Sequence, residues 1–121
     1  MTEGAFTRKL LSALRKHPAL EKAVVWKISD RWTAGIPDFA VIVPPVTLTT
    51  FFEVKVAPNH LTRLQQVMLE RMGQRAFLIR RWKDGNGFDI VSDYYKDGNG
   101  YMECRHKFEE LVERIAELCV A

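Results

Sequence analysis

The sequence predicts an α/β fold with a mixed central sheet flanked by helices. The unbroken apolar run at 39–43 is typical of a strand that is covered on both faces. A second strand at 49–56 is followed by helically spaced apolar residues at 61–72 and by a third strand at 75–82. This crossover makes strands 49–56 and 75–82 parallel neighbours, whereas the short connections of the earlier strands predict antiparallel pairing.

Four further elements complete the predicted order α-β-β-β-α-β-β-α. They are a helix over 3–16, a short strand over 24–28, a strand over 88–95 and a closing helix over 107–120. The strand over 88–95 lies between two copies of Lys-Asp-Gly-Asn-Gly. Their Asp-Gly and Asn-Gly dipeptides are typical of tight hairpin turns.

The composition is that of one ordinary globular domain. The chain has 121 residues, of which 47% are hydrophobic and 27% charged, so a second independent core is excluded. Two cysteines without CxxC spacing indicate neither a zinc cluster nor a disulfide framework, which favours a reducing cytoplasm. We expect no secretory signal and no membrane span, because the apolar runs are far shorter than about 20 residues.

The charge is mildly basic and unevenly distributed. The formal net charge is +3, and residues 1–65 carry nine lysines and arginines against five acids. A basic half of this kind permits a polyanionic partner such as a nucleic acid, but the charge alone favours an ordinary solvated surface.

The strand at 49–56 carries charges where an apolar residue is expected. Alternation places Phe52 and Val54 on one face and Glu53 and Lys55 on the other. Charged residues rarely lie in a buried strand without a partner. The pair therefore indicates either a structural ion pair or a site with chemistry.

The register of the hairpin places a second carboxylate beside the first. A turn centred between Pro45 and Val46 sets Asp38 directly opposite Glu53. Opposed side chains have Cβ atoms about 4.5–5.5 Å apart, and like charges at that spacing are destabilising. Two such carboxylates need a shared proton or a cation, and Mg²⁺ usually takes one or two protein carboxylates. The alternative is that Asp38 only begins a strand.

The spacing of these residues resembles that of a nuclease superfamily. Gly35-x-Pro-Asp38, Glu53-x-Lys55 and Leu61-Thr62-x-x-Gln65 are similar to the motifs of PD-(D/E)XK nucleases, in particular the small stand-alone VRR-NUC (virus-type replication-repair nuclease) members found in phages and bacteria. The resemblance covers residues 3–82. We expect the whole chain, residues 1–121, to form a single domain. The resemblance implies a restriction-endonuclease-like α-β-β-β-α-β core, with a C-terminal extension, a hairpin and a helix, at 83–121.

The resemblance implies a role for each motif residue. Asp38 and Glu53 would be ligands of Mg²⁺ or Mn²⁺, with the backbone carbonyl of Val54 as a third ligand. Lys55 would orient or activate the attacking water, or neutralise charge on the scissile phosphate. Whether one ion or two take part is left open.

Two more residues match the family in position. Gln65 corresponds to the helix glutamine near the site, and its spacing from Thr62 selects it over Gln66; an exposed helical amide is the alternative. Glu3 corresponds to a first-helix acid near the metal, and the alternative is a first-turn acid favoured by the helix dipole.

Several basic and aromatic residues are candidates for nucleic-acid contacts. They are Arg8, Lys9, Lys27, Arg31, Trp32 and Arg63. Arg31 and Trp32 lie in the loop that leads to the site, where the indole either stacks on a base or packs against the fold. Another basic cluster, Arg80, Arg81 and Lys83, follows the strand at 75–82.

The expected function is that of a metal-dependent DNA endonuclease in repair or recombination, and the resemblance implies cleavage that leaves a 5′-phosphate. Its substrate would be double-stranded, branched, flapped or Holliday-junction DNA in a bacterial or phage-infected cell. Because symmetric four-way junctions are cut by two copies, we expect a homodimer. The alternatives are a non-catalytic nucleic-acid-binding module that retains the fold, and an interaction protein without a nucleic-acid role.

Overall fold

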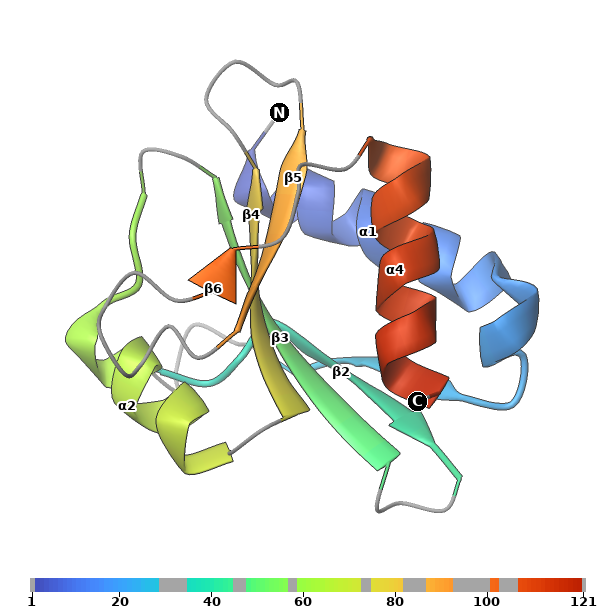
Figure 1. Cartoon of the computed structure of the whole chain (residues 1–121), viewed down its shortest axis with the longest axis horizontal. Helices are drawn as coiled ribbons and strands as arrows, with labels where there is room; N and C mark the ends of the chain where they lie inside the picture. Colours follow the sequence, from blue (N-terminus) through green and yellow to red (C-terminus); the bar gives the residue numbers. More distant parts are fainter. Residues whose placement is uncertain are drawn as a thin grey trace.

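The computed structural model describes residues 2–28, 35–44, 48–56, 59–72, 75–81, 87–92, 101–102 and 107–120. The elements are α1 (Glu3–Lys16), η1 (Pro18–Leu20), β1 (Val24–Lys27), β2 (Phe39–Val43), β3 (Leu48–Val56), α2 (Arg63–Met72), β4 (Ala76–Arg81), β5 (Phe88–Ser92), β6 (Tyr101–Met102) and α4 (Phe108–Val120). They confirm an α/β fold whose mixed sheet has helices on both faces (Figure 1). No helix in these ranges is long and apolar enough to cross a membrane.

The sheet follows the chain order β1-β2-β3-β4-β5-β6. The predicted directions are confirmed, since β3 and β4 are parallel and the β1–β2 and β2–β3 pairs are antiparallel. The predicted hairpin register is also confirmed, with Phe39 opposite Phe52 and Val43 opposite Leu48. The second half of the predicted strand 88–95 and most of the two repeated turns lie outside the described residues.

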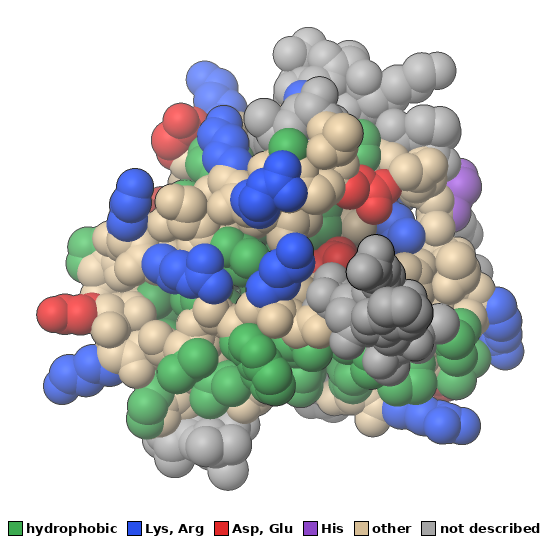
Figure 2. Space-filling view, turned by 180° about the vertical axis from the view of Figure 1, so that it is seen from behind, with side chains coloured by type: hydrophobic (Ala, Val, Ile, Leu, Met, Phe, Trp, Pro, Cys, Tyr) green, Lys and Arg blue, Asp and Glu red, His purple; other side chains and the backbone are tan. Residues whose placement is uncertain are grey.

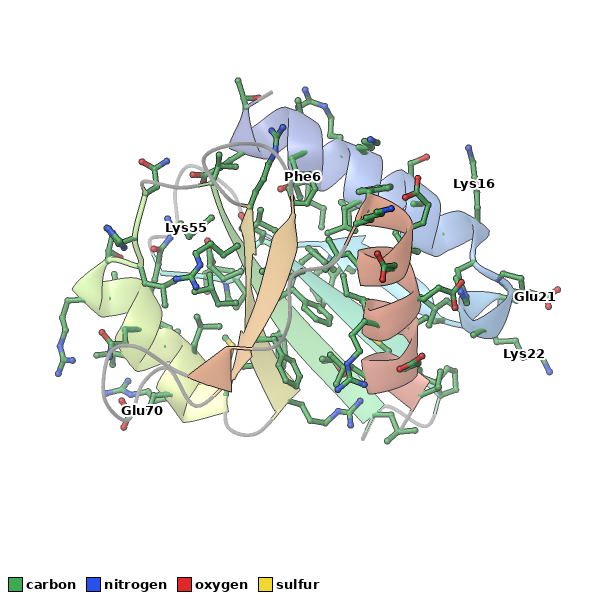
Figure 3. All side chains as sticks on the ribbon, turned by 45° about the horizontal axis from the view of Figure 1, so that its top comes forward. Phe6, Lys16, Glu21, Lys22, Lys55 and Glu70 are labelled. Atoms are coloured by element: carbon green, nitrogen blue, oxygen red, sulfur yellow. The ribbon has the colours of Figure 1, made fainter. Side chains whose placement is uncertain are left out.

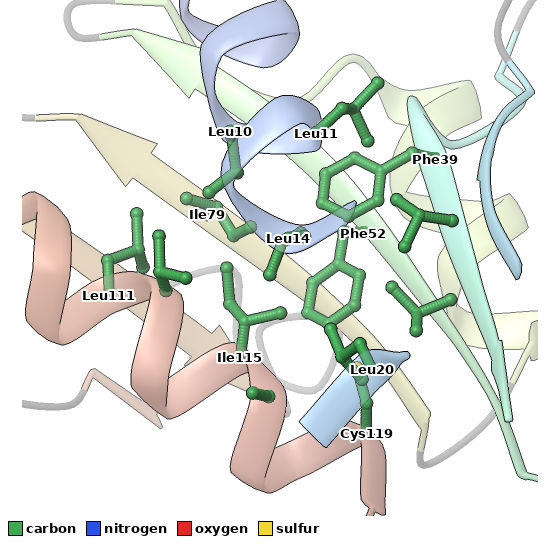
Figure 4. Packing of buried hydrophobic residues seen from close by; sticks show 14 of the residues in the cluster. Leu10, Leu11, Leu14, Leu20, Phe39, Phe52, Ile79, Leu111, Ile115 and Cys119 are labelled. Atoms are coloured by element: carbon green, nitrogen blue, oxygen red, sulfur yellow. The ribbon is translucent and has the colours of Figure 1, made fainter. Parts of the chain in front are cut away.

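The main core lies between the sheet and the two helices α1 and α4. Leu10 and Leu14 of α1 and Ile115 of α4 pack on Phe39 and Phe52, and all five side chains are almost fully buried (Figure 4). The two phenylalanine rings stack with centroids 4.9 Å apart. The apolar positions of both helices recur at helical spacing, so each buries one face against the same side of the sheet.

A smaller cluster covers the opposite face of the sheet. Leu69 of α2 packs there with Ala76 and Leu78 of β4. Because successive side chains of a strand alternate, the β3 residues that do not face the main core face α2 instead. This second face contains Glu53 and Lys55.

The C-terminal helix is an integral part of the fold and not an extension of a core that ends near residue 82. Leu111, Ile115 and Cys119 are fully buried in the main cluster. Arg75 fixes the end of this helix, because its Nη2 donates to the carbonyl oxygens of Leu118 and Cys119, both at 3.2 Å. The apolar face of α4 therefore lies inside the molecule.

Candidate active site

Strand β3 continues beyond the point where its neighbour β2 begins. Phe39 and Phe52 are the last residue pair of the β2–β3 ladder at this end. The following residues of β3 therefore have an open flank, the side of the strand that is no longer paired with β2. Alternate N–H groups of a strand point to the same side, and that of Val54 faces this flank. Asp38 fills the gap, because its Oδ2 accepts a 2.6 Å hydrogen bond from the Val54 N–H.

A second carboxylate continues the same pattern two residues further along. Oε2 of Glu3 accepts a 3.3 Å hydrogen bond from the Val56 N–H and a 2.6 Å hydrogen bond from Nδ2 of Asn59. Glu3 therefore joins the start of α1 to the end of β3. The structure places this predicted residue at the rim of the site, engaged with backbone and amide donors.

Glu53 is the most deeply buried charged residue of the site, with 3% of its surface exposed. One carboxyl oxygen, Oε1, accepts a 3.3 Å hydrogen bond from Nε2 of Gln65. The other oxygen, Oε2, is buried and receives no hydrogen bond. The carboxyl group of Asp38 is within hydrogen-bonding reach of Glu53, but two carboxylates can bond only if one of them holds a proton.

The surroundings of Glu53 favour its protonated form. Burial, and then the negative charge of Asp38, raise the pKa of Glu53 from about 4.5 to about 9, and the nearby Lys55 offsets only part of this shift. In the protein without a cation, Glu53 is therefore protonated at neutral pH and can share its proton with Asp38. The geometry thus agrees with the sequence-based inference that the two carboxylates need a proton or a cation between them.

Gln65 is held in place by a capping box at the start of α2. The Gln65 N–H donates to Oγ1 of Thr62 at 3.1 Å, and the Thr62 N–H donates to Oε1 of Gln65 at 2.9 Å. Because the amide oxygen is engaged in the cap, the amide nitrogen is free to point at Glu53. The structure thus brings Gln65 into contact with Glu53, in agreement with its choice over Gln66.

Replacing Gln65 with alanine should lower the free energy of unfolding by about 1–2 kcal/mol, since the variant loses half of the capping box and the bond to Glu53. Urea denaturation followed by circular dichroism measures this loss. Gln66→Ala is the matched control, because it changes the adjacent amide and leaves the box intact. Equal midpoints for the two variants would contradict this role of Gln65.

Two cationic residues extend the site along β3 and β4. Lys55 lies on the α2 side of the sheet (Figure 3), and the parallel register places Arg80 directly beside it. In the register of β4 and β5, Arg80 is also directly opposite Asp89. Sequence reasoning placed Arg80 only in a separate basic cluster, because a crossover fixes strand direction without fixing register.

Gly35 determines how closely the loop before Asp38 approaches α2. Its φ is +84°, in the left-handed region that favours glycine. A Cβ atom at this position would lie 2.8 Å from Cγ of Leu64 and 3.0 Å from Cγ of Met68. The glycine lets segment 35–38 lie directly on the helix that also holds Gln65.

The candidate nucleic-acid residues do not form one cluster. Arg8 on α1, Lys27 on β1 and Arg63 at the start of α2 are exposed. Lys9 lies over the Phe108 ring, with Nζ 4.2 Å from the ring centroid, so it has a structural contact between α1 and α4. Arg31 and Trp32 lie outside the described residues.

The donor set fits a cation that needs few protein ligands. Among the described residues, no group of three or more His, Cys, Asp or Glu is arranged to hold a metal ion. Asp38 and Glu53 provide two carboxylates, and the buried Oε2 of Glu53 has no donor to satisfy it. The carbonyl of Val54 points to the same open flank as its N–H, next to Asp38. Mg²⁺ commonly accepts one or two carboxylates and completes its shell with water and phosphate.

The fold and the site together define an α/β protein with a carboxylate pair at the open end of a central strand, in which Glu53 is buried and Asp38 is half-buried. Comparison of the chain with protein-family models, with curated proteins and with solved structures found no match. Any assignment of function therefore depends on the chemistry of the site itself.

Proposed function

We propose that this chain is a metal-dependent nuclease of the PD-(D/E)XK type that hydrolyses phosphodiester bonds in DNA. The observation that carries the proposal is the carboxyl pair of Asp38 and Glu53, in which Glu53 has a buried oxygen without a donor. Lys55 lies two residues along the same face of the strand. Opposed carboxylates repel a phosphate unless a cation lies between them, so the pair has no evident use in a module that only binds DNA.

Each residue of the site has a task in this reaction. Asp38, Glu53 and the Val54 carbonyl would hold Mg²⁺ or Mn²⁺, an ion that lowers the pKa of bound water and neutralises phosphate charge. Gln65 fixes the orientation of the Glu53 carboxylate through its 3.3 Å hydrogen bond. Lys55 binds a non-bridging phosphate oxygen or orients the attacking water.

The bond changes follow from these positions. The oxygen of the attacking water forms a new bond to phosphorus as the bond from phosphorus to the 3′-oxygen breaks. The water gives up a proton and the departing 3′-oxygen takes one up. The products are a 5′-phosphate and a 3′-hydroxyl, with no covalent enzyme intermediate.

Replacing Asp38 with asparagine tests the proposal. We expect wild-type protein to cut at least one of linear, flapped, splayed or four-way DNA with Mn²⁺ or Mg²⁺ but not in EDTA. Loss of metal-assisted stabilisation should slow Asp38→Asn by roughly 10³-fold or more, measured as product on a denaturing gel. Glu21→Gln is the matched control, since it removes an exposed acid of the basic half that is far along the chain from the site.

Two results would reject the proposal. One is a pure protein that cuts none of these substrates with either ion. The other is cleavage that persists unchanged in Asp38→Asn. Salt-sensitive DNA binding that is indifferent to divalent ions, without cleavage, would identify the chain as a binding module.

The proposal extends to assembly and location. Two symmetric cuts in a four-way junction need two active sites, so we propose that a homodimer acts on such substrates in the cytoplasm of a bacterial or phage-infected cell. Light scattering of the protein with and without junction DNA measures the number of copies. A monomer in both samples would exclude the junction-resolving form and leave cleavage of flapped or linear DNA unaffected.

A further inference from the structure

A large aromatic side chain is exposed in the edge strand β1. Trp26 is 53% exposed, which is unusual for an indole in a regular strand. Val24, two residues earlier in the same strand, is 56% exposed. Figure 2 shows one face of the molecule, with a band of hydrophobic side chains along its lower part and lysine and arginine side chains above that band.

Trp26 lies on the same face of the sheet as the carboxylate pair. Its neighbour Val25 faces the main core, so alternation directs Trp26 to the opposite face, the one that carries Glu53. In the register of β1 and β2, Trp26 is opposite Ala40, which is two residues from Asp38. Strand spacing and rise place the Cα atoms of Trp26 and Asp38 about 8 Å apart.

One backbone group on the outer edge of β1 is bound by a basic side chain. The Ile28 N–H bonds to the Asp38 carbonyl, so Val25 has its polar groups on the outer edge. Nη2 of Arg15 donates to the Val25 carbonyl at 2.9 Å. A basic side chain on an edge strand opposes the addition of a further strand. One acceptor of the outer edge is therefore engaged, and the indole is exposed beside it.

The charges around this surface suit a nucleic-acid strand. On the side of the sheet that carries Trp26 and Glu53, Lys55 lies on β3 and the exposed Arg63 begins α2. Proteins that bind single strands combine cations for the phosphates with aromatic side chains on which bases stack.

We propose that Trp26 stacks on an unpaired base next to the phosphate held at Asp38 and Glu53. The inference rests on the proposed nuclease function and narrows its substrate class to DNA with a single-stranded segment at the cleaved bond. Flapped and splayed DNA and free single strands have such a segment, whereas a continuous duplex does not.

The proposal is tested by binding in a cleavage-deficient background. Glu53→Gln is combined with Trp26→Ala, Trp26→Phe or Val24→Ala, and fluorescence anisotropy measures the affinity for a labelled 12-nucleotide single strand. Since stacking contributes about 1–3 kcal/mol per base, Trp26→Ala should weaken binding roughly 5- to 100-fold. Trp26→Phe should retain most of the affinity. Val24→Ala, an equally exposed side chain farther from Asp38, should bind within about twofold of the parent.

The same variants are also measured with an oligonucleotide of the same length that contains abasic positions. Its affinity should be low and should not change with Trp26→Ala. Equal binding of the normal strand by Trp26→Ala and its parent would overturn the proposal. So would parallel losses in Trp26→Ala and Val24→Ala that sedimentation traces to a lost dimer, because the exposed side chains of β1 would then form a contact between copies of the chain.

The outcome of the binding experiment can be distinguished from the outcome of the cleavage assay. Unchanged single-strand binding by Trp26→Ala, with cleavage abolished by Asp38→Asn, would reject the stacking proposal alone. An inactive wild-type protein whose single-strand binding still depends on Trp26 would reject the nuclease function alone.

Discussion

Replacing Glu53 with glutamine should abolish cleavage and at the same time stabilise the metal-free protein above neutral pH. The amide cannot serve as a charged ligand, so the rate of DNA cleavage should fall by roughly 10³-fold or more. The buried Oε2 of Glu53 has no donor. In the variant an amide nitrogen at this position can donate to Asp38, while the amide oxygen keeps the bond from Gln65. Glutamic acid at position 53 thus supplies a charged metal ligand, but it stabilises the metal-free protein less than glutamine would.

The pH dependence follows from the raised pKa of Glu53. Its pKa is about 9 in the folded protein and close to 4.5 in the unfolded chain. Between these values the folded state holds a proton that the unfolded state has released, so the free energy of unfolding decreases as the pH rises from about 4.5 to about 9. Glutamine has no such proton. The stability advantage of Glu53→Gln should therefore be smallest below pH 4.5 and largest near pH 9.

Thermal melts in EDTA at pH 5, 7 and 9 measure this advantage. A gain of about 2 kcal/mol at pH 9 corresponds to a rise in Tm on the order of 8 °C for a domain of this size. Glu70→Gln, which alters an exposed acid on α2, should show no such trend. Mn²⁺ at pH 9 should raise the Tm of the wild type and not that of Glu53→Gln. A Glu53→Gln protein that is less stable at all three pH values would contradict the argument.

The local elements and the carboxylate pair could be predicted from the sequence because they depend on short-range rules. Alternation assigned Glu53 and Lys55 to one face, and the centre of the turn fixed the register that brings Asp38 to Glu53. The spacing from Thr62 distinguished Gln65 from Gln66, since a capping box has a fixed length.

The remaining features depend on how distant segments meet. An amphipathic stripe shows that α4 buries a face, but not that the face completes the main core with α1. The bond between Glu3 and Val56 joins residues far apart in the chain, and no local pattern encodes it. Trp26 also gives no signal in the sequence, because its exposure depends on β1 being an edge strand.

Replacing Gly35 with alanine should be among the most damaging single changes outside the reacting groups. The left-handed backbone costs an alanine about 1–2 kcal/mol. The new Cβ would lie 2.8 Å from Cγ of Leu64 and 3.0 Å from Cγ of Met68, which adds about 1–3 kcal/mol of overpacking. We expect the free energy of unfolding to fall by about 2–5 kcal/mol in urea denaturation. Cleavage should fall at least tenfold even where the variant is folded, because segment 35–38 positions Asp38.

Two further variants separate the causes of this loss. Gly4→Ala is the matched control, since its Cβ would meet Nη1 of Arg8 at an ordinary 3.6 Å and alanine is the better helix former. Leu64 is 47% exposed, so its truncation costs little by itself. Adding Leu64→Ala to Gly35→Ala removes the closest contact but not the left-handed φ. Partial recovery of stability would separate the steric contribution of Leu64 from the rest, whereas a double variant no more stable than Gly35→Ala would show that the contact with Leu64 is not what makes glycine necessary.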